Sequence, residues 1–97
     1  PQDAQALDVF LVAMRECLTN CVRHAEGTKL FISAGAEENG YTLCISNNGK
    51  PPEEEIVPKG GLKNLSHHVE NAGGTMEIGW EQAFELRIYI PKGEGLI

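Results

Sequence analysis

Polar side chains with the means to do chemistry recur along the stretch RECLTNCVRHA, residues 15–25. Glu16, Asn20 and His24 are four residues apart and Arg23 precedes His24, so on a helix they form one row. Asn is a poor helix former, and a merely solvated face more often carries Lys, Glu or Gln. Carboxylate and amide oxygens suit Mg²⁺, whereas Arg and His suit phosphate oxygens. The row therefore predicts the wall of a site for a metal-bound polyphosphate.

A second feature of matching chemistry lies in PKGGLKN, residues 58–64. Gly60 and Gly61 directly precede a helical pattern, where free backbone N–H groups and the helix dipole favour an anion. Glycine also lets the backbone approach phosphate closely, and Lys59 and Lys63 flank the pair. The Walker pattern of P-loop proteins is absent, so this feature predicts an anion site of another kind.

Two helices and two hairpins are expected to position these residues. Apolar residues at helical spacing predict a first helix after Asp3, ending at Gly27. Its apolar stripe is expected to face the sheet, opposite the polar row; it comprises Leu7, Phe10, Leu11, Met14, Leu18, Val22 and Ala25.

The remaining elements follow from alternation and turn residues. Strands are expected at 29–34 and 41–46, joined by a two-residue turn at Asn39-Gly40 with both φ angles positive. A loop spans 47–61, a helix runs from Gly61 to a stop at 72–74, and a hairpin covers 75–80 and 84–90. This order predicts an α/β two-layer sandwich, with two helices on one face of a largely antiparallel sheet.

Composition narrows the class of protein. A chain of 97 residues is expected to form one domain. Its net charge of -6 argues against a nucleic-acid partner, and no apolar run is long enough to span a membrane. Its three cysteines fit buried, reduced thiols. Because the sequence runs almost directly into a helix, the chain is expected to be a piece of a longer protein.

Three motifs in order resemble one family. The polar row matches the family's N box, E-x-x-x-N-x-x-R/K-H. The first glycine box, D-x-G-x-G, is resembled by SNNGKPP, residues 46–52. The second glycine box, G-x-G-L followed by a helix that ends in Gly-Gly, is resembled by GGLKNLSHHVENAGGTMEI, residues 60–78. The chain thus resembles, from about residue 7 to residue 90, the ATP-binding (HATPase) domain of bacterial sensor histidine kinases in the GHKL superfamily. The Thr before Asn20 and the Arg-His after it resemble the nitrate-sensor and DesK-like subfamily.

The resemblance implies a Bergerat-type ATP-binding fold and a role for each matching residue. It makes Asn20 the Mg²⁺ ligand and Glu16 the catalytic acidic residue, which orients water or the attacking group in related ATPases. The other implied ATP-binding residues are Arg23, His24, Asn47, Gly49, Lys59, Gly60, Gly61 and Leu62. The segment 50–60 corresponds to the ATP lid.

Three departures from the family pattern bear on the site. Asn47 replaces the Asp that accepts from the adenine amino group, so the charge-assisted part of that bond is lost and weaker ATP binding is expected. Pro51 and Lys59 replace one glycine in each glycine box.

The resemblance also implies the reaction and the partners. The expected activity is that of a protein-histidine kinase: transfer of the ATP γ-phosphoryl group, with Mg²⁺, to a histidine on a separate dimerisation domain of the same parent protein. That domain is absent from these residues, so the piece alone is not expected to be self-sufficient. A response regulator is the expected downstream partner, the parent is expected to be homodimeric, and the domain is expected to be cytoplasmic in a parent that is membrane-anchored or soluble.

Three alternatives stay open on the residues alone. The chain could be a non-kinase GHKL ATPase or a degenerate nucleotide-binding regulatory module. Cys17, Cys21 and His24 could hold zinc, although three ligands from one helix make a poor zinc pattern. The row could also be the solvated face of a plain interaction domain.

Overall fold

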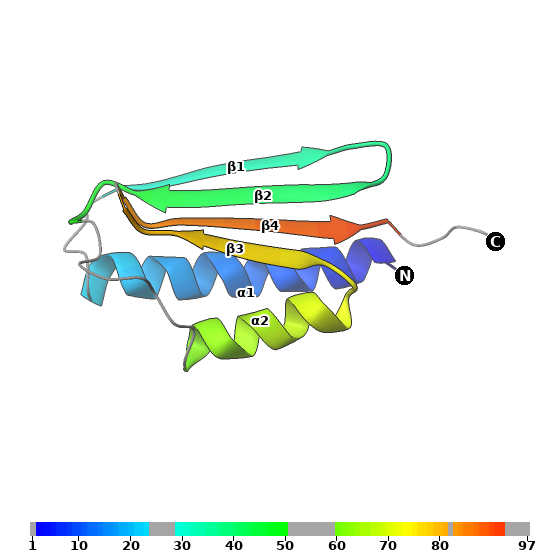
Figure 1. Cartoon of the computed structure of the whole chain (residues 1–97), viewed down its shortest axis with the longest axis horizontal. Coiled ribbons are helices and arrows are strands. Elements are labelled where there is room, and N and C mark those ends of the chain that lie inside the picture. The colour runs from blue at the N-terminus through cyan, green and yellow to red at the C-terminus, as the bar shows by residue number, and fades with distance from the viewer. Residues whose placement is uncertain (1, 24–28, 51–59, 82, 93–97) are drawn as a thin grey trace.

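Two helices cover one face of a four-stranded antiparallel sheet (Figure 1). The computed structural model describes residues 2–23, 29–50, 60–81 and 83–92, and of these the side chains of residues 2, 3, 20, 22 and 23 are outside the description. The elements are α1 (Gln2–Arg23), β1 (Leu30–Ala36), β2 (Gly40–Asn47), α2 (Gly61–Asn71), β3 (Thr75–Gly79) and β4 (Glu85–Pro91). The predicted two-layer α/β sandwich is confirmed.

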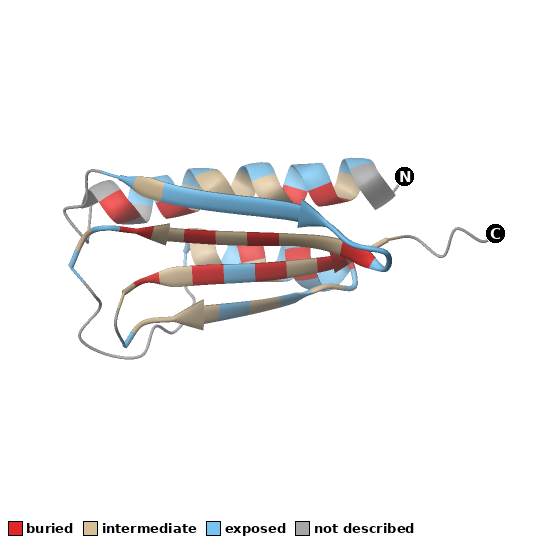
Figure 2. Ribbon diagram, turned by 90° about the horizontal axis from the view of Figure 1, so that it is seen from above, coloured by how far each residue is buried: buried red, intermediate tan, exposed pale blue. Residues whose placement is uncertain are grey.

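The sheet order β1-β2-β4-β3 places β2 and β4 in the centre. Alternate residues of these two strands are buried, because side chains of a strand point to opposite faces and only one face meets the helices (Figure 2). Helix α1 contacts β2 and β4, and α2 contacts β3 and α1. The core lies between these helices and the central strands; its fully buried large side chains include Phe84, Ile45, Leu65, Leu86 and Ile90.

The predicted orientation of α1 is wrong. Leu7, Leu11 and Leu18 are 52–57% exposed, whereas the buried face consists of Ala6, Val9, Ala13, Cys17 and Cys21. Small side chains let the helix backbone come close to the sheet, so they form the contact face although they carry less apolar surface. On a helical wheel this buried face lies beside Glu16 and Asn20. Glu16 therefore lies beside the core face and not opposite it.

The β1–β2 turn also differs from its prediction. Ala36 pairs with Tyr41 and the Glu37 N–H donates to the Gly40 carbonyl at 2.7 Å, so the two turn residues are Glu38 and Asn39. Gly40 has no positive φ. A Cβ atom there would lie 2.6 Å from the Tyr89 ring, so close approach of that ring explains the glycine.

Helix α2 ends as predicted at Gly73-Gly74. Gly73 has φ +77°, its N–H donates to the Glu70 carbonyl, and the Gly74 N–H donates to the Val69 carbonyl, both at 2.9 Å. This pair of bonds is the Schellman motif, which requires a left-handed residue after the helix. It turns the chain directly into β3.

Matched leucine substitutions test which helix faces are buried. Leu65→Ala is expected to lower the free energy of unfolding by about 2–5 kcal/mol, because Leu65 is fully buried and its removal leaves a cavity. Leu18→Ala, at a position 53% exposed, is expected to cost less than about 1 kcal/mol. Urea unfolding of both variants measures the difference; equal costs would contradict the assignment of the two faces.

Candidate functional site

One end of the sandwich gathers most of the predicted site. Helix α1 ends there, β2 ends there, and α2 begins there (Figure 1). Glu16 and Asn20 lie in the last two turns of α1, Asn47 is the last residue of β2, and Gly61 is the first residue of α2. Segments far apart in the sequence thus supply the polar row, the first glycine box and the second glycine box from neighbouring positions.

The carboxylate of Glu16 lies directly against the start of α2. A Cβ atom built at Gly61 would overlap Oε1 and Cδ of Glu16, and its Oε2 would lie 2.9 Å away. The acidic side chain of another helix therefore occupies the space that a Cβ atom at Gly61 would take. The same carboxylate is paired with Arg15, Nε to Oε2 at 3.5 Å, and its side chain is 22% exposed. This contact joins the polar row to the glycine pair.

The N-terminus of α2 fits an anion. No side chain caps it by a hydrogen bond, and no acidic residue stands in its first turn. The positive end of the helix dipole and unpaired N–H groups favour negative charge there. The two glycines suit their positions for different reasons. Gly60 has φ +60°, a conformation that other residues rarely adopt, although nothing lies within 4 Å of a built Cβ atom. At Gly61, a built Cβ atom would overlap the Glu16 carboxyl group.

Asn47 is buried at the end of β2. It is 4% exposed, and among the described residues it is the one polar side chain that is buried. Its Oδ1 accepts the Gly49 N–H at 2.8 Å, so Asn47 and Gly49 form one small turn. Its Nδ2 is buried and, among the described residues, has no hydrogen-bond partner. The resemblance assigned this side chain the role of an acceptor; the group without a partner is a donor.

Other predicted residues are described only in part or not at all. Asn20 and Arg23 lie within α1, but their side chains are outside the description. Leu62 is partly buried against the core. His24, Lys59 and most of the predicted lid, residues 51–59, lie outside the described residues.

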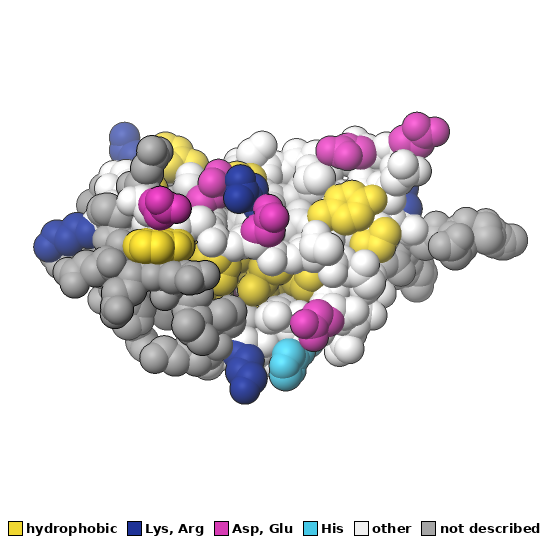
Figure 3. All heavy atoms as spheres, in the orientation of Figure 1, with side chains coloured by type: hydrophobic (Ala, Val, Ile, Leu, Met, Phe, Trp, Pro, Cys, Tyr) yellow, Lys and Arg dark blue, Asp and Glu magenta, His cyan; other side chains and the backbone are white. Residues whose placement is uncertain are grey.

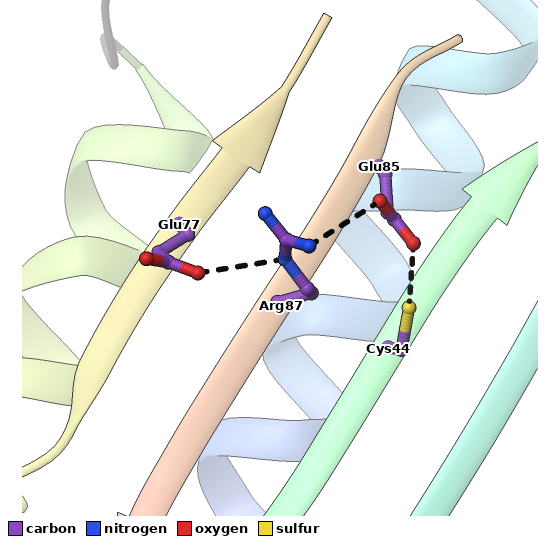
Figure 4. A network of polar contacts seen from close by, with 4 residues as sticks. All are labelled: Cys44, Glu77, Glu85 and Arg87. Carbon is purple, nitrogen blue, oxygen red and sulfur yellow. Dashed lines mark hydrogen bonds and ion pairs between the residues drawn. The ribbon is translucent and has the colours of Figure 1, made fainter.

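Sequence reasoning missed two polar groups. Asn48 Oδ1 accepts the Lys29 N–H at 2.9 Å, which closes the β1–β2 ladder beside Asn47. The position of Asn48 within the first glycine box is the sequence feature that could have pointed to this residue. On the open face of the sheet, the Cys44 thiol donates to Glu85 at 3.1 Å, and Arg87 pairs with Glu85 and Glu77 at 3.8 and 3.5 Å (Figure 4). These exposed ion pairs are each worth at most about 1 kcal/mol.

The face of the molecule drawn in Figure 3 shows how its described charges are arranged. Basic side chains stand apart from one another among acidic ones on the face drawn in Figure 3, whereas a phosphate backbone requires a basic patch. No described helix is long and apolar enough to cross a membrane.

The cysteines of α1 line the core, as predicted. Cys17 and Cys21 are 0% and 2% exposed, and burial, with the nearby charge of Glu16, raises the pKa of Cys17 to about 12. His24, the third residue of the zinc alternative, lies outside the described residues. Within the described ranges no cluster of metal-binding side chains forms.

The raised pKa of Cys17 predicts how the stability of the folded protein depends on pH. Its ordinary value is 9.0 and its folded value is about 12, so the folded state retains a proton that the unfolded state loses. The contribution of this thiol to the free energy of unfolding is therefore fully present below pH 9, and it is lost as the pH rises toward 12. Urea unfolding between pH 8 and 10.5 should show a steeper loss for the wild type than for Cys17→Ala, which keeps every other titrating group; parallel slopes would contradict this.

Comparisons with solved structures identify the class of fold. The chain matches no protein-family model. The histidine kinase domain of the blue-light activated histidine kinase from Erythrobacter litoralis superposes with a TM-score of 0.76 over 93% of this chain and 46% of that chain, at 17% identity. A second structure of that kinase gives a TM-score of 0.67 over 82% of this chain and 28% of that one, at 19% identity. The fold is therefore that of a histidine kinase domain.

Sequence comparison points to particular relatives. The chain is 32% identical over 66 residues to the sensor protein VraS of Staphylococcus epidermidis and 30% identical over 66 residues to that of Staphylococcus aureus. These matches cover 66% of this chain and 19% of each relative, so the chain spans about a fifth of the length of the curated relatives it matches. The chain therefore shares the fold of a histidine kinase domain, and about two thirds of it is similar in sequence to part of a sensor protein.

Proposed function

We propose that the chain is the ATP-binding catalytic domain of a two-component sensor histidine kinase. It transfers the γ-phosphoryl group of ATP to a histidine on a separate dimerisation domain of the same parent protein. The observation that carries the proposal is the contact between Glu16 and Gly61 at the end of the sandwich where β2 delivers Asn47. That arrangement accompanies homology to a sensor protein and the fold of a histidine kinase domain.

Residues at this end fit the parts of a nucleotide. The unpartnered Nδ2 of Asn47 fits a base that carries a hydrogen-bond acceptor. The uncapped start of α2 at Gly60, Gly61 and Leu62 fits a phosphate group. Arg23, His24 and Lys59 would add positive charge, and Gly49 would let the backbone pass close to the base.

Glu16 sets a condition on phosphate binding. Its carboxylate lies where the dipole of α2 would also attract a phosphate, and two anions at one helix terminus repel each other. A divalent cation between them removes that conflict, which supports the proposed Mg²⁺ site at Asn20 with Glu16 adjacent. ATP would supply the phosphoryl group when bound; Glu16 would orient the attacking histidine and accept the proton from the ring nitrogen that does not attack.

The proposed partners follow from the same role. The parent protein would be a homodimer that presents the phosphoacceptor histidine and passes the phosphoryl group to a response regulator. The domain would act in the cytoplasm, whether the parent is membrane-anchored or not. Residues 1–97 would form one domain, of the nitrate-sensor and DesK-like subfamily.

Phosphoryl transfer by the parent protein tests the proposal. Incubation of the parent protein with Mg²⁺ and ATP labelled in the γ-phosphate should give an acid-labile, base-stable label on the protein, as expected for a phosphohistidine. Label that fails to appear although ATP binds would favour the second candidate, a non-kinase or degenerate nucleotide-binding module. The engaged Oδ1 of Asn47, where the family pattern has an Asp, is the observation in favour of that candidate.

A further inference from the structure

Strand β1 forms one edge of the sheet and is exposed along nearly all of its length (Figure 2). Its outer side pairs with no other described strand. Its sequence, LFISAGA, contains no charged residue and no proline. Charged residues and proline ordinarily keep an edge strand from pairing with another chain, so β1 lacks the usual protection against such pairing.

The side chains of β1 present apolar surface on both faces of the sheet. Ile32 lies opposite Ile45 of β2 and therefore on the helix side. It is nevertheless 47% exposed, because α1 lies against β2 and β4. Phe31, on the open face, is 52% exposed. Contiguous exposed apolar surface indicates an interaction site.

Helix α1 adds apolar surface on the same side of the sandwich. Its residue Glu16 lies against the start of α2, and α2 contacts β3 at the other edge of the sheet. On a helical wheel the exposed leucines of α1 lie on the flank opposite Glu16, so they face the side where β1 lies. All the exposed large hydrophobic side chains of the described residues are therefore on this side: Leu7, Leu11, Leu18, Phe31 and Ile32.

The backbone of β1 determines how a further strand can pair with it. The Glu37 N–H donates to the Gly40 carbonyl, and the Asn48 N–H donates to the Lys29 carbonyl. The odd-numbered residues of this strand therefore direct their backbone groups toward β2, because the direction alternates along a strand. The even-numbered residues 30, 32, 34 and 36 direct their N–H and C=O groups toward the open edge.

We propose that β1 pairs antiparallel with β1 of a second copy of this chain, in a register centred on Ser33, and so joins two sheets into one. Ile32 of each copy then lies opposite Ala34 of the other, so the outward backbone groups of both residues form hydrogen bonds. Because paired residues share one face of a sheet, the helices of both copies cover the same face. Phe31 lies opposite Gly35 of the other copy, where no side chain obstructs the ring.

Charges at the two ends of β1 select this register. Lys29 precedes β1 and Glu37 follows it, and each is four residues from Ser33. Antiparallel pairing centred on Ser33 places Lys29 of each copy opposite Glu37 of the other, so two pairs of opposite charge form. A register shifted by two residues keeps the backbone pairing but loses both charge pairs. This complementarity within one strand favours a second copy as the occupant of the edge.

Sedimentation equilibrium of the 97-residue chain tests the proposal. The wild type should dimerise at concentrations below about 1 mM, since small protein interfaces give weak complexes. Lys29→Glu and Glu37→Lys should each raise the dimer dissociation constant by at least about fivefold, because each places like charges opposite one another at both ends of the strand pair. The variant with both substitutions should return to within about twofold of the wild type, because opposite charges again face each other.

Glu70→Lys is the matched control, because it makes the same charge change at an exposed position of α2, away from β1. It should leave the dimer dissociation constant unchanged. A general effect of net charge would instead make Glu37→Lys dimerise more strongly, because that substitution reduces the net negative charge of the chain. The two explanations therefore predict opposite signs for Glu37→Lys.

A wild-type chain that stays monomeric, or a dimer that does not respond to the charge exchange, would overturn the inference. Slow amide hydrogen exchange at Ile32 and Ala34 in the parent protein, together with a monomeric 97-residue chain, would assign the edge to another strand of the parent and would also overturn it. Neither result bears on the proposed function, which the labelling of the parent protein tests separately.

Discussion

Glu16→Gln is expected to slow phosphoryl transfer in the parent protein by about 10²–10³-fold while nucleotide affinity changes by less than about threefold. Glutamine has nearly the shape of glutamate, so the packing against Gly61 is retained. The change removes the negative charge and the capacity to hold the proton of the attacking histidine. Initial rates of protein labelling from γ-labelled ATP, with the ADP dissociation constant measured separately, give both quantities.

Arg15→Gln is the control for Glu16→Gln. It removes the ion pair between Arg15 and Glu16 but keeps the carboxylate. Since the Arg15 side chain is 69% exposed, this pair is expected to contribute little, and labelling should change by less than about threefold. A Glu16→Gln protein that labels at the wild-type rate would show that Glu16 is not catalytic.

Gly61→Ala is expected to weaken Mg–ADP binding by at least about tenfold and to lower labelling to a few per cent of the wild-type rate. The new methyl group would occupy the space of the Glu16 carboxyl group. Because that group is the end of a flexible side chain, the fold should survive and the carboxylate should move away from α2. Calorimetry, the labelling assay and urea unfolding measure the three consequences.

Two comparisons separate overlap from other effects of Gly61→Ala. Gly79→Ala places a methyl group at ordinary contact distance, 3.7 Å from Glu85 Cβ, and should leave nucleotide binding unchanged. Adding Glu16→Ala to Gly61→Ala removes the overlapping carboxyl group, so any stability lost in the single variant should return in the double variant. Normal Mg–ADP binding by Gly61→Ala would contradict the proposed location of the phosphates.

The order of elements was predictable because local signals agree with the tertiary structure. Gly73-Gly74 stops α2 where the sequence pattern places the stop, and alternating apolar residues mark β2 and β4. The hairpin turn shifted by one residue because the glycine signal at Gly40 has a tertiary cause, the Tyr89 ring. A sequence pattern cannot separate a glycine required by φ from one required by a neighbour.

The orientation of α1 could not be read from hydrophobicity. Its leucines are the strongest apolar residues, yet Ala13 and Cys17 face the sheet because their size permits close packing. The prediction placed Glu16 opposite the core, whereas Glu16 lies beside the core and against the start of α2. Such a contact between helices distant in sequence has no local signal.

The candidate site was predictable in its motifs but not in its chemistry. The three motifs point to the end of the sandwich where α1, β2 and α2 meet. The sequence alone could not show that Gly49 engages Oδ1 of Asn47 and leaves Nδ2 without a partner. That detail depends on the local turn after β2, and it makes the free group of Asn47 a donor where the family pattern has an acceptor.

Amide NMR during titration with Mg–ADP shows where the nucleotide binds. The largest shifts are expected to cluster at Asn20, Asn47 and Gly61, which belong to three elements that meet at one end of the fold. The open face of the sheet offers a competing hollow of about 250 Å³, lined in part by Ser33, Thr42 and Tyr89. Shifts confined to that hollow, or a titration without shifts at saturating nucleotide, would contradict a nucleotide site between α1 and α2.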